Sequence, residues 1–225
     1  MTPTFQPPRP KFLDAYRQEG MPLWGVTVQN EPGACSVTYE GMHWDPATER
    51  DFIKGHLGPR LRKDHPEVNL LIYDHNKKDV MAWVDTILGD PEAAQYVNGT
   101  AVHWYDGDHF DQLAAAHKAQ PEKMIVATEA TVARNAHPDL PVWHDGEHYA
   151  HDIIGDLNAW VVAWLDWNLL LDRFGGPDHA GPEECEGDIK CGSSSMMMAA
   201  IDLQTVWKQI FYYYVGHFSK YIVPG

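Results

Sequence analysis

Two glutamates in this sequence stand where a charge is costly, at the ends of stretches that are otherwise apolar or β-branched. The first is Glu31 in WGVTVQNEP (24–32), whose alternating Trp, Val and Val residues predict a strand. We expect that strand to end at Glu31, because Pro32 has no N–H to donate to a sheet. The second is Glu129 in KMIVATEATV (123–132), where an apolar run again ends on a carboxylate.

Two carboxyl groups that face one pocket are suited to cleaving a glycosidic bond. A separation of about 5–5.5 Å favours retention, and about 6.5–9.5 Å favours inversion. We expect Glu31 to be the acid and then the base, while Asn30 holds a sugar hydroxyl. Crowding by walls such as Trp24 and by the other carboxylate should raise the pKa of Glu31 toward roughly 6. Glu129 should stay ionised as the nucleophile, helped by a donor such as the Tyr105 hydroxyl. Three tryptophans offer flat apolar faces on which sugar rings can stack: Trp104, Trp164 and Trp167.

The elements that must position these residues alternate along the chain. Apolar runs predict strands within 24–31, 68–73, 97–105, 123–129 and 159–168. Helical spacing predicts helices within 45–63, 78–88, 108–119, 148–158 and 206–215. Asp45 followed by Pro46 is typical of a helix N-terminus, and Pro59 predicts a kink just before it.

Alternating strands and helices predict a parallel sheet, with polar residues gathered at the carboxyl ends of the strands. A (β/α)8 barrel and a doubly wound open sheet both place their sites there. We favour the barrel, because the sequence has no G-x-G-x-x-G phosphate loop. His103, at one strand end, is more typical of a hydrogen-bonded wall residue than of a catalyst. Residues 74–76, at another, are equally typical of substrate contacts and of a polar loop.

Composition limits the classes of function. The chain has 225 residues, of which 44% are hydrophobic, so one globular domain over 11–225 is expected after a proline-rich lead-in, 1–10. The net charge of −15 argues against nucleic acid, and no apolar run reaches the length of about 18 residues that a membrane span needs. The N-terminus does not resemble a signal peptide. The 13 histidines show no paired metal spacing, so no metal is expected. Whether Cys185 and Cys191, in one polar loop, form a disulfide stays open.

Five blocks of sequence, taken together, resemble the glucosylceramidase branch of glycoside hydrolase family 30. They are WGVTVQNEP, AVHWY, ATEA, DWNLLLD followed by GGP, and YYYVGHFSKYIVPG, and the resemblance runs from about Lys11 to Gly225. It implies hydrolysis of the β-glucosyl bond of glucosylceramide with retention and without a cofactor. By this match Glu31 is the acid/base and Glu129 the nucleophile. The implied substrate-binding residues are Asn30, Tyr105 and Trp167 in the sugar subsite, with Trp104 and Asp166 close by.

The resemblance also carries expectations about setting and completeness. It implies a glycolipid substrate met at a membrane surface, a small lipid-presenting activator protein, and a lysosomal or secreted location. Members of the family have eight barrel strands and an antiparallel β domain. We therefore expect a partial TIM (β/α)8 barrel of class α/β, containing strands four to eight with their helices. Two alternatives stay open: a catalytically inert or weakly sugar-binding chain, and a relative that cleaves another β-glycoside such as xylan or β-glucan.

Overall fold

A computed structural model of the protein describes residues 11–34, 41–132, 137–177, 193–200, 202 and 204–224. The lead-in 1–10 and all three cysteines, Cys35, Cys185 and Cys191, lie outside these described residues. The proline-rich lead-in therefore stays a prediction, and whether Cys185 and Cys191 form a disulfide stays open.

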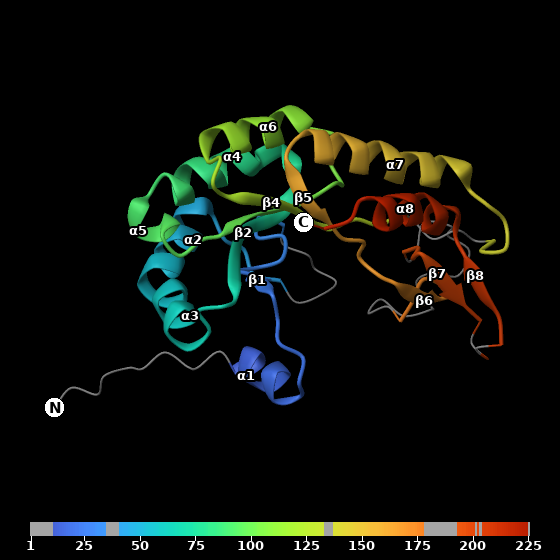
Figure 1. Ribbon diagram of the computed structural model, residues 1–225, viewed down its shortest axis with the longest axis horizontal. Coiled ribbons are helices and arrows are strands. Elements are labelled where there is room, and N and C mark those ends of the chain that lie inside the picture. The colour runs from blue at the N-terminus through green and yellow to red at the C-terminus, as the bar shows by residue number, and fades with distance from the viewer. Residues whose placement is uncertain are drawn as a thin grey trace.

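A parallel five-stranded sheet forms the centre of the molecule. Its strands follow chain order, β1 (Gly25–Thr27), β2 (Asn69–Asn76), β3 (Gly99–His103), β4 (Met124–Glu129) and β5 (Val161–Trp164). Every adjacent pair is parallel. The strands lie inside an arc of helices, as a segment of a barrel wall does (Figure 1). This confirms the predicted α/β class and the partial TIM barrel, although β1 ends at Thr27, before the predicted end at Glu31.

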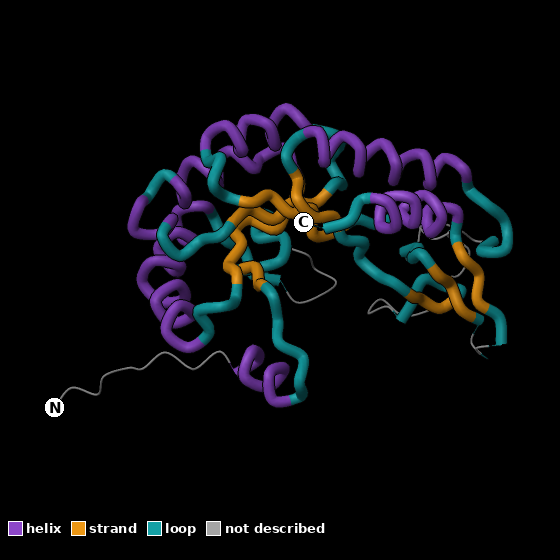
Figure 2. The backbone as a smooth tube through the Cα atoms, viewed as in Figure 1, coloured by secondary structure: helices purple, strands orange, loops and turns teal. Residues whose placement is uncertain are grey.

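Helices connect the strands along the outer side of the arc (Figure 2). After α1 (Lys11–Gln18), the segments between β1 and β3 are α2 (Pro46–Phe52), η1 (Ile53–Leu57), α3 (Gly58–Asp64), η2 (Lys77–Asp79), α4 (Val80–Trp83), η3 (Val84–Leu88) and α5 (Pro91–Ala94). The longer helices α6 (Phe110–Ala119) and α7 (Trp143–Asn158) follow β3 and β4. Asp45 caps α2, accepting a hydrogen bond from the Thr48 N–H at 2.8 Å, as its sequence predicts. The kink expected before Pro59 takes the form of the π-helical turn η1.

The chain's last part differs from the prediction. A helix was expected over 206–215, but Val206–Lys208 forms strand β8 and helix α8 runs from Ile210 to Tyr221. Strand β8 pairs antiparallel with β7 (Met197–Ala199), which pairs parallel with β6 (Leu170–Asp172). This small second sheet was not predicted, because strands of three residues carry too little periodicity to be recognised. None of the described helices has both the length and the apolar character needed to cross a membrane.

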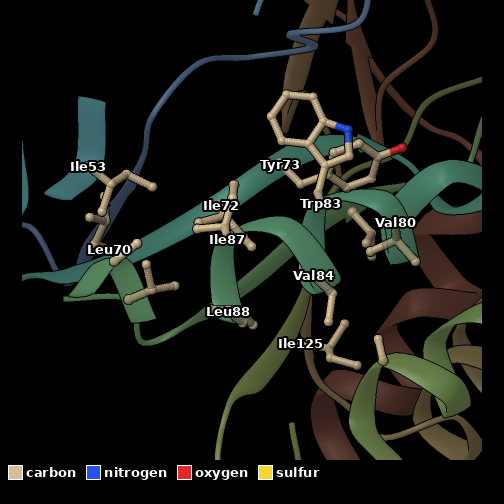
Figure 3. Packing of buried hydrophobic residues seen from close by; sticks show 14 of the residues in the cluster. Ile53, Leu70, Ile72, Tyr73, Val80, Trp83, Val84, Ile87, Leu88 and Ile125 are labelled. Carbon is tan, nitrogen blue, oxygen red and sulfur yellow. The ribbon is translucent and has the colours of Figure 1, made fainter. Parts of the chain in front are cut away.

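Both faces of the sheet pack against apolar side chains. On the outer face, Leu70 and Ile72 of β2 meet Val80, Val84 and Ile87 of the following helix (Figure 3). Residues on the opposite face form a separate cluster of Leu71, Ala101 and Val126. Side chains of a strand alternate between faces, so this pattern fixes which residues point outward and which line the barrel interior.

Candidate active site

The two predicted glutamates lie at the same edge of the sheet. Glu129 is the last residue of β4, and Glu31 follows β1 in a turn where it adopts a positive φ of 47°. The Glu31 N–H donates to the carbonyl of Asp74 at 2.9 Å, which ties this turn to the end of β2. Because the strands are parallel, their carboxyl ends bring the turn and the tip of β4 to one side of the sheet.

His103 joins the two carboxylates. Its ring is 1% exposed, its Nδ1 lies 3.2 Å from Glu31 Oε1, and its Nε2 lies 3.9 Å from Glu129 Oε2. The same Nε2 lies 3.1 Å from Asp74 Oδ1. Glu31 and Glu129 therefore lie beside opposite nitrogens of one imidazole ring. His75 adds a second imidazole, with its Nδ1 3.7 Å from Glu31 Oε1.

Asp74 fixes the orientation of His103. Besides His103 it accepts hydrogen bonds from the hydroxyls of Thr27 and Thr128, each at 2.6 Å. Burial raises the pKa of Asp74, but its hydrogen bonds with His103 and the two threonines outweigh that effect and hold the pKa below its usual value. A carboxylate held ionised beside Nε2 keeps a proton on that nitrogen, as in the triad arrangement in which a carboxylate orients a histidine.

The electrostatics differ from the expectation. We expected crowding to raise the pKa of Glu31, but hydrogen bonds with His103 and His75 hold it well below its usual value. Burial lowers the pKa of His103, yet its bonds to Asp74 and Glu31 outweigh this and raise it to about 9. Burial raises the pKa of Glu129, although the His103 charge and the Tyr105 hydroxyl oppose this. Trp24, expected to crowd Glu31, is instead exposed.

The remaining predicted site residues fall into two groups. Tyr105 lies in the pocket, where its hydroxyl donates to Glu129 Oε1 at 2.9 Å and its N–H donates to Asn76. Trp167 follows β5 with a ring that is 49% exposed, and Asn30 is exposed beside Glu31. Asp166, after β5, accepts a hydrogen bond from the Tyr149 hydroxyl at 2.8 Å, and burial raises its pKa to about 7.

The two other tryptophans do not offer open faces to a sugar. Trp104 is 5% exposed, stacks on His148 at 4.3 Å and donates its indole N–H to the carbonyl of Thr131. Trp164 is half-buried and donates its indole N–H to Asp152 at 2.9 Å. Trp104 is enclosed by the rings of His148, Tyr149 and Trp164.

The sequence left the roles of Asp74 and His75 undecided, and it favoured a wall residue over a catalyst at His103. The available signal was their location, since each stands at the polar end of a predicted strand. What the sequence lacked was the register that places His103 of β3 between β1 and β4 and within reach of Asp74 on β2. The contacts of His103 with three carboxylates favour a role in the chemistry over that of a simple wall residue.

Comparisons with known proteins agree on one family. The model of the glycosyl hydrolase family 30 TIM-barrel domain matches residues 8–222. The chain is 37% identical to lysosomal acid glucosylceramidase of Mus musculus, over 96% of this chain and 42% of that protein. Among solved structures, SrfJ from Salmonella typhimurium superposes with a TM-score of 0.83 at 28% identity, and the endo-β1,6-glucanase BT3312 with 0.78 at 26%. Each match covers 96% of this chain and 46% of the solved one, so the chain spans less than half of these relatives.

Proposed function

This chain belongs to glycosyl hydrolase family 30, and on that premise we propose that it serves as a retaining β-glucosidase that hydrolyses glucosylceramide to glucose and ceramide. The observation that carries the proposal is the pair Glu31 and Glu129 on opposite nitrogens of the buried His103 ring. Retaining and inverting glycosidases both use a pair of carboxyl groups, and the proposal of retention follows the family resemblance. The 37% identity to a protein named glucosylceramidase supports the substrate.

In the first step the Glu129 carboxylate attacks the anomeric carbon, and Glu31 gives a proton to the departing ceramide oxygen. The bond from the anomeric carbon to that oxygen breaks as the bond to Glu129 forms. In the second step Glu31 takes a proton from water, whose oxygen attacks the anomeric carbon and releases Glu129. Two displacements restore the original β configuration. The Tyr105 hydroxyl orients the nucleophile through its hydrogen bond to Glu129 Oε1.

The proton for the first step belongs to the Glu31–His103 pair. Before the reaction Glu31 is ionised, because His103 carries the proton and its Nδ1 lies 3.2 Å from Glu31 Oε1. The buried ring is therefore a proton reservoir next to Glu31 Oε1. Transfer of one proton from Nδ1 to Oε1 gives the acid form, and Asp74 stabilises the ring before the transfer.

The proposed substrate also implies where the protein works and with which partners. A glycolipid substrate implies contact with a lipid surface, and the mouse relative named lysosomal supports a lysosomal location. A small lipid-presenting activator protein completes this proposal. A second candidate substrate is a β-1,6-glucan, favoured by the structural match to an endo-β1,6-glucanase at a TM-score of 0.78. A third candidate, a chain without catalysis, is one outcome of the labelling experiment below.

Labelling with a mechanism-based β-glucoside inactivator tests the roles. The folded chain should acquire one glucosyl label, located on Glu129 by peptide mass spectrometry, and E129Q should acquire none. With an activated leaving group E31Q should still label at Glu129, because departure then needs little acid help. A label on any other residue refutes the role of Glu129. Absence of both labelling and chromogenic β-glucoside hydrolysis in folded protein favours the inert alternative. Relative rates on glucosylceramide and β-1,6-glucan choose between substrates.

A further inference from the structure

One cluster of side chains joins Glu31 and His103 to a second imidazole, His75, that the proposed glycosidase mechanism does not use. Glu31, His75 and His103 offer a carboxylate oxygen and two imidazole nitrogens that all lie within 4.8 Å of one another. We name this set the Glu31–His75–His103 cluster. Its three residues come from the turn after β1, from β2 and from β3, so they show no regular spacing in the sequence. Two imidazoles and a carboxylate are ligands typical of Zn²⁺ sites with an open fourth position.

The distances suit a first-row divalent ion. Bonds of about 2.0–2.2 Å from zinc to nitrogen and oxygen imply tetrahedral ligand separations of roughly 3.4 Å. The two separations that involve Glu31 Oε1 are 3.2 Å to His103 Nδ1 and 3.7 Å to His75 Nδ1, on either side of that value. The third separation, between the two imidazole nitrogens, also lies within 4.8 Å.

The backbone of β2 turns His75 toward Glu31. Tyr73 and Asp74 adopt positive φ values of 77° and 59°, and the pairing with β3 shifts register between Tyr73 and His75. Such a bulge changes which face a side chain points to, and left-handed backbone at non-glycine residues is costly enough to be tied to function. The Nδ1 atom of His75 is buried and faces Glu31 Oε1 at 3.7 Å, with no hydrogen-bond partner within 3.5 Å among the described residues. Once it gives up its proton, such a nitrogen is available as a metal ligand.

A second layer of contacts prepares His103 in the same way. Its Nε2 faces Asp74 Oδ1 at 3.1 Å, so the proton sits on Nε2 when the ring is neutral and the Nδ1 lone pair faces Glu31. Metal-binding histidines commonly donate their other N–H to a carboxylate, which fixes the tautomer. Asp74 is in turn held by two threonine hydroxyls.

We propose that the Glu31–His75–His103 cluster binds Zn²⁺ through three protein ligands and that the bound ion inhibits glycoside hydrolysis by occupying Glu31 Oε1. The inhibition rests on the proposed function, because it assigns the acid/base to Glu31, whereas the binding site rests on geometry alone. Glu129 takes no part in the coordination, because it faces the Nε2 side of His103. The site prefers Zn²⁺ to Mg²⁺, since hard cations bind oxygen ligands rather than imidazole.

Isothermal titration of the chain with Zn²⁺ tests the binding. Wild type should bind one ion, and E31Q and H75Q should each bind Zn²⁺ at least about 10-fold more weakly. Loss of an outer-shell partner alone weakens metal binding by about 10–100-fold, so loss of a ligand should cost no less. E129Q is the matched control, because it removes the other carboxylate of the pocket. H151Q removes a surface imidazole paired with one carboxylate, Asp108, at 2.9 Å. Both controls should keep the wild-type affinity, and Mg²⁺ should give no binding heat.

Two outcomes overturn the site: wild type that binds no Zn²⁺, or H75Q that folds normally and keeps its affinity. X-ray absorption at the zinc edge of the wild-type complex gives a check without mutation, with two imidazoles expected and fewer than two overturning the assignment. Steady-state hydrolysis of a chromogenic β-glucoside then tests the inhibition, which should be competitive with substrate. Binding without hydrolysis in the absence of zinc contradicts the proposed function but not the site. Hydrolysis that saturating Zn²⁺ leaves unchanged contradicts the inhibition.

Discussion

Replacing Lys77 by methionine should strongly lower the stability of the protein, because it removes a buried charge that neutralises two buried carboxylates. The ammonium is 0% exposed, with Nζ 2.5 Å from Asp152 Oδ1 and 2.6 Å from Asp156 Oδ1. Methionine keeps the length of the side chain but removes the charge, which leaves two carboxylates in the protein interior. Losing one partner of a buried ion pair costs about 3–5 kcal/mol. For a chain of this size that corresponds to a fall in Tm of roughly 6–20 °C.

The assay is thermal unfolding followed by circular dichroism. Lys54→Met is the matched control, because Lys54 also lies between two carboxylates, Asp90 at 2.9 Å and Glu92 at 3.6 Å, but near the surface. Its Tm change should be much the smaller of the two, because exposed ion pairs contribute little to stability. The reasoning also predicts that replacing Asp152 and Asp156 by asparagine in the Lys77→Met background restores most of the lost stability. Equal Tm changes for Lys77→Met and Lys54→Met would refute it.

The buried group of Lys77, Asp152 and Asp156 also makes the stability of the protein depend on pH. Burial raises the folded-state pKa of Asp156 to about 7, with Asp152 adding to the effect and the Lys77 charge opposing it. The folded state therefore holds a proton that the unfolded chain, with a carboxyl pKa of about 3.9, has released. This contribution to stability is present at low pH and is lost as pH rises toward about 7. In Lys77→Met the pKa of Asp156 rises further, so the penalty of the substitution should shrink in acid. Denaturant titrations from pH 4 to 8 measure this.

Three further substitutions test other parts of the structure. Tyr105→Phe removes the hydroxyl that donates to Glu129, a bond to a charged group worth about 1.5–3 kcal/mol, so kcat/KM should fall about 10- to 150-fold in steady-state assays with the fold intact. Unchanged kcat/KM would contradict the orientation of the nucleophile. Gly155→Ala places a methyl group against the ring of Phe110, so it should lower the free energy of unfolding by about 1–3 kcal/mol in denaturant titration despite the better helix propensity of alanine. Asp45→Ala removes the cap of α2 and should lower the denaturant midpoint of unfolding, whereas an unchanged midpoint would show that the cap contributes nothing.

The sequence by itself determined the alternation of the five parallel strands with their helices, and the pair of carboxylates. Alternation of apolar runs with helical spacing requires parallel strands, whose carboxyl ends meet at one edge of the sheet. Glu31 and Glu129 follow such runs, so their approach to one pocket was predictable from local pattern alone. Asp45 and Pro46 likewise specified the start of α2, since a cap depends only on residues within one turn.

Only the tertiary structure decided how those carboxylates are charged and what surrounds them. The register that seats His103 against Glu31, Asp74 and Glu129 lowers the pKa of Glu31, opposite to the expectation from crowding. The bulge that aims His75, the burial of Trp104 and the enclosure of Lys77 depend equally on partners far away in sequence. A pKa and a burial are sums over neighbours in space, whereas a periodic pattern records only neighbours along the chain.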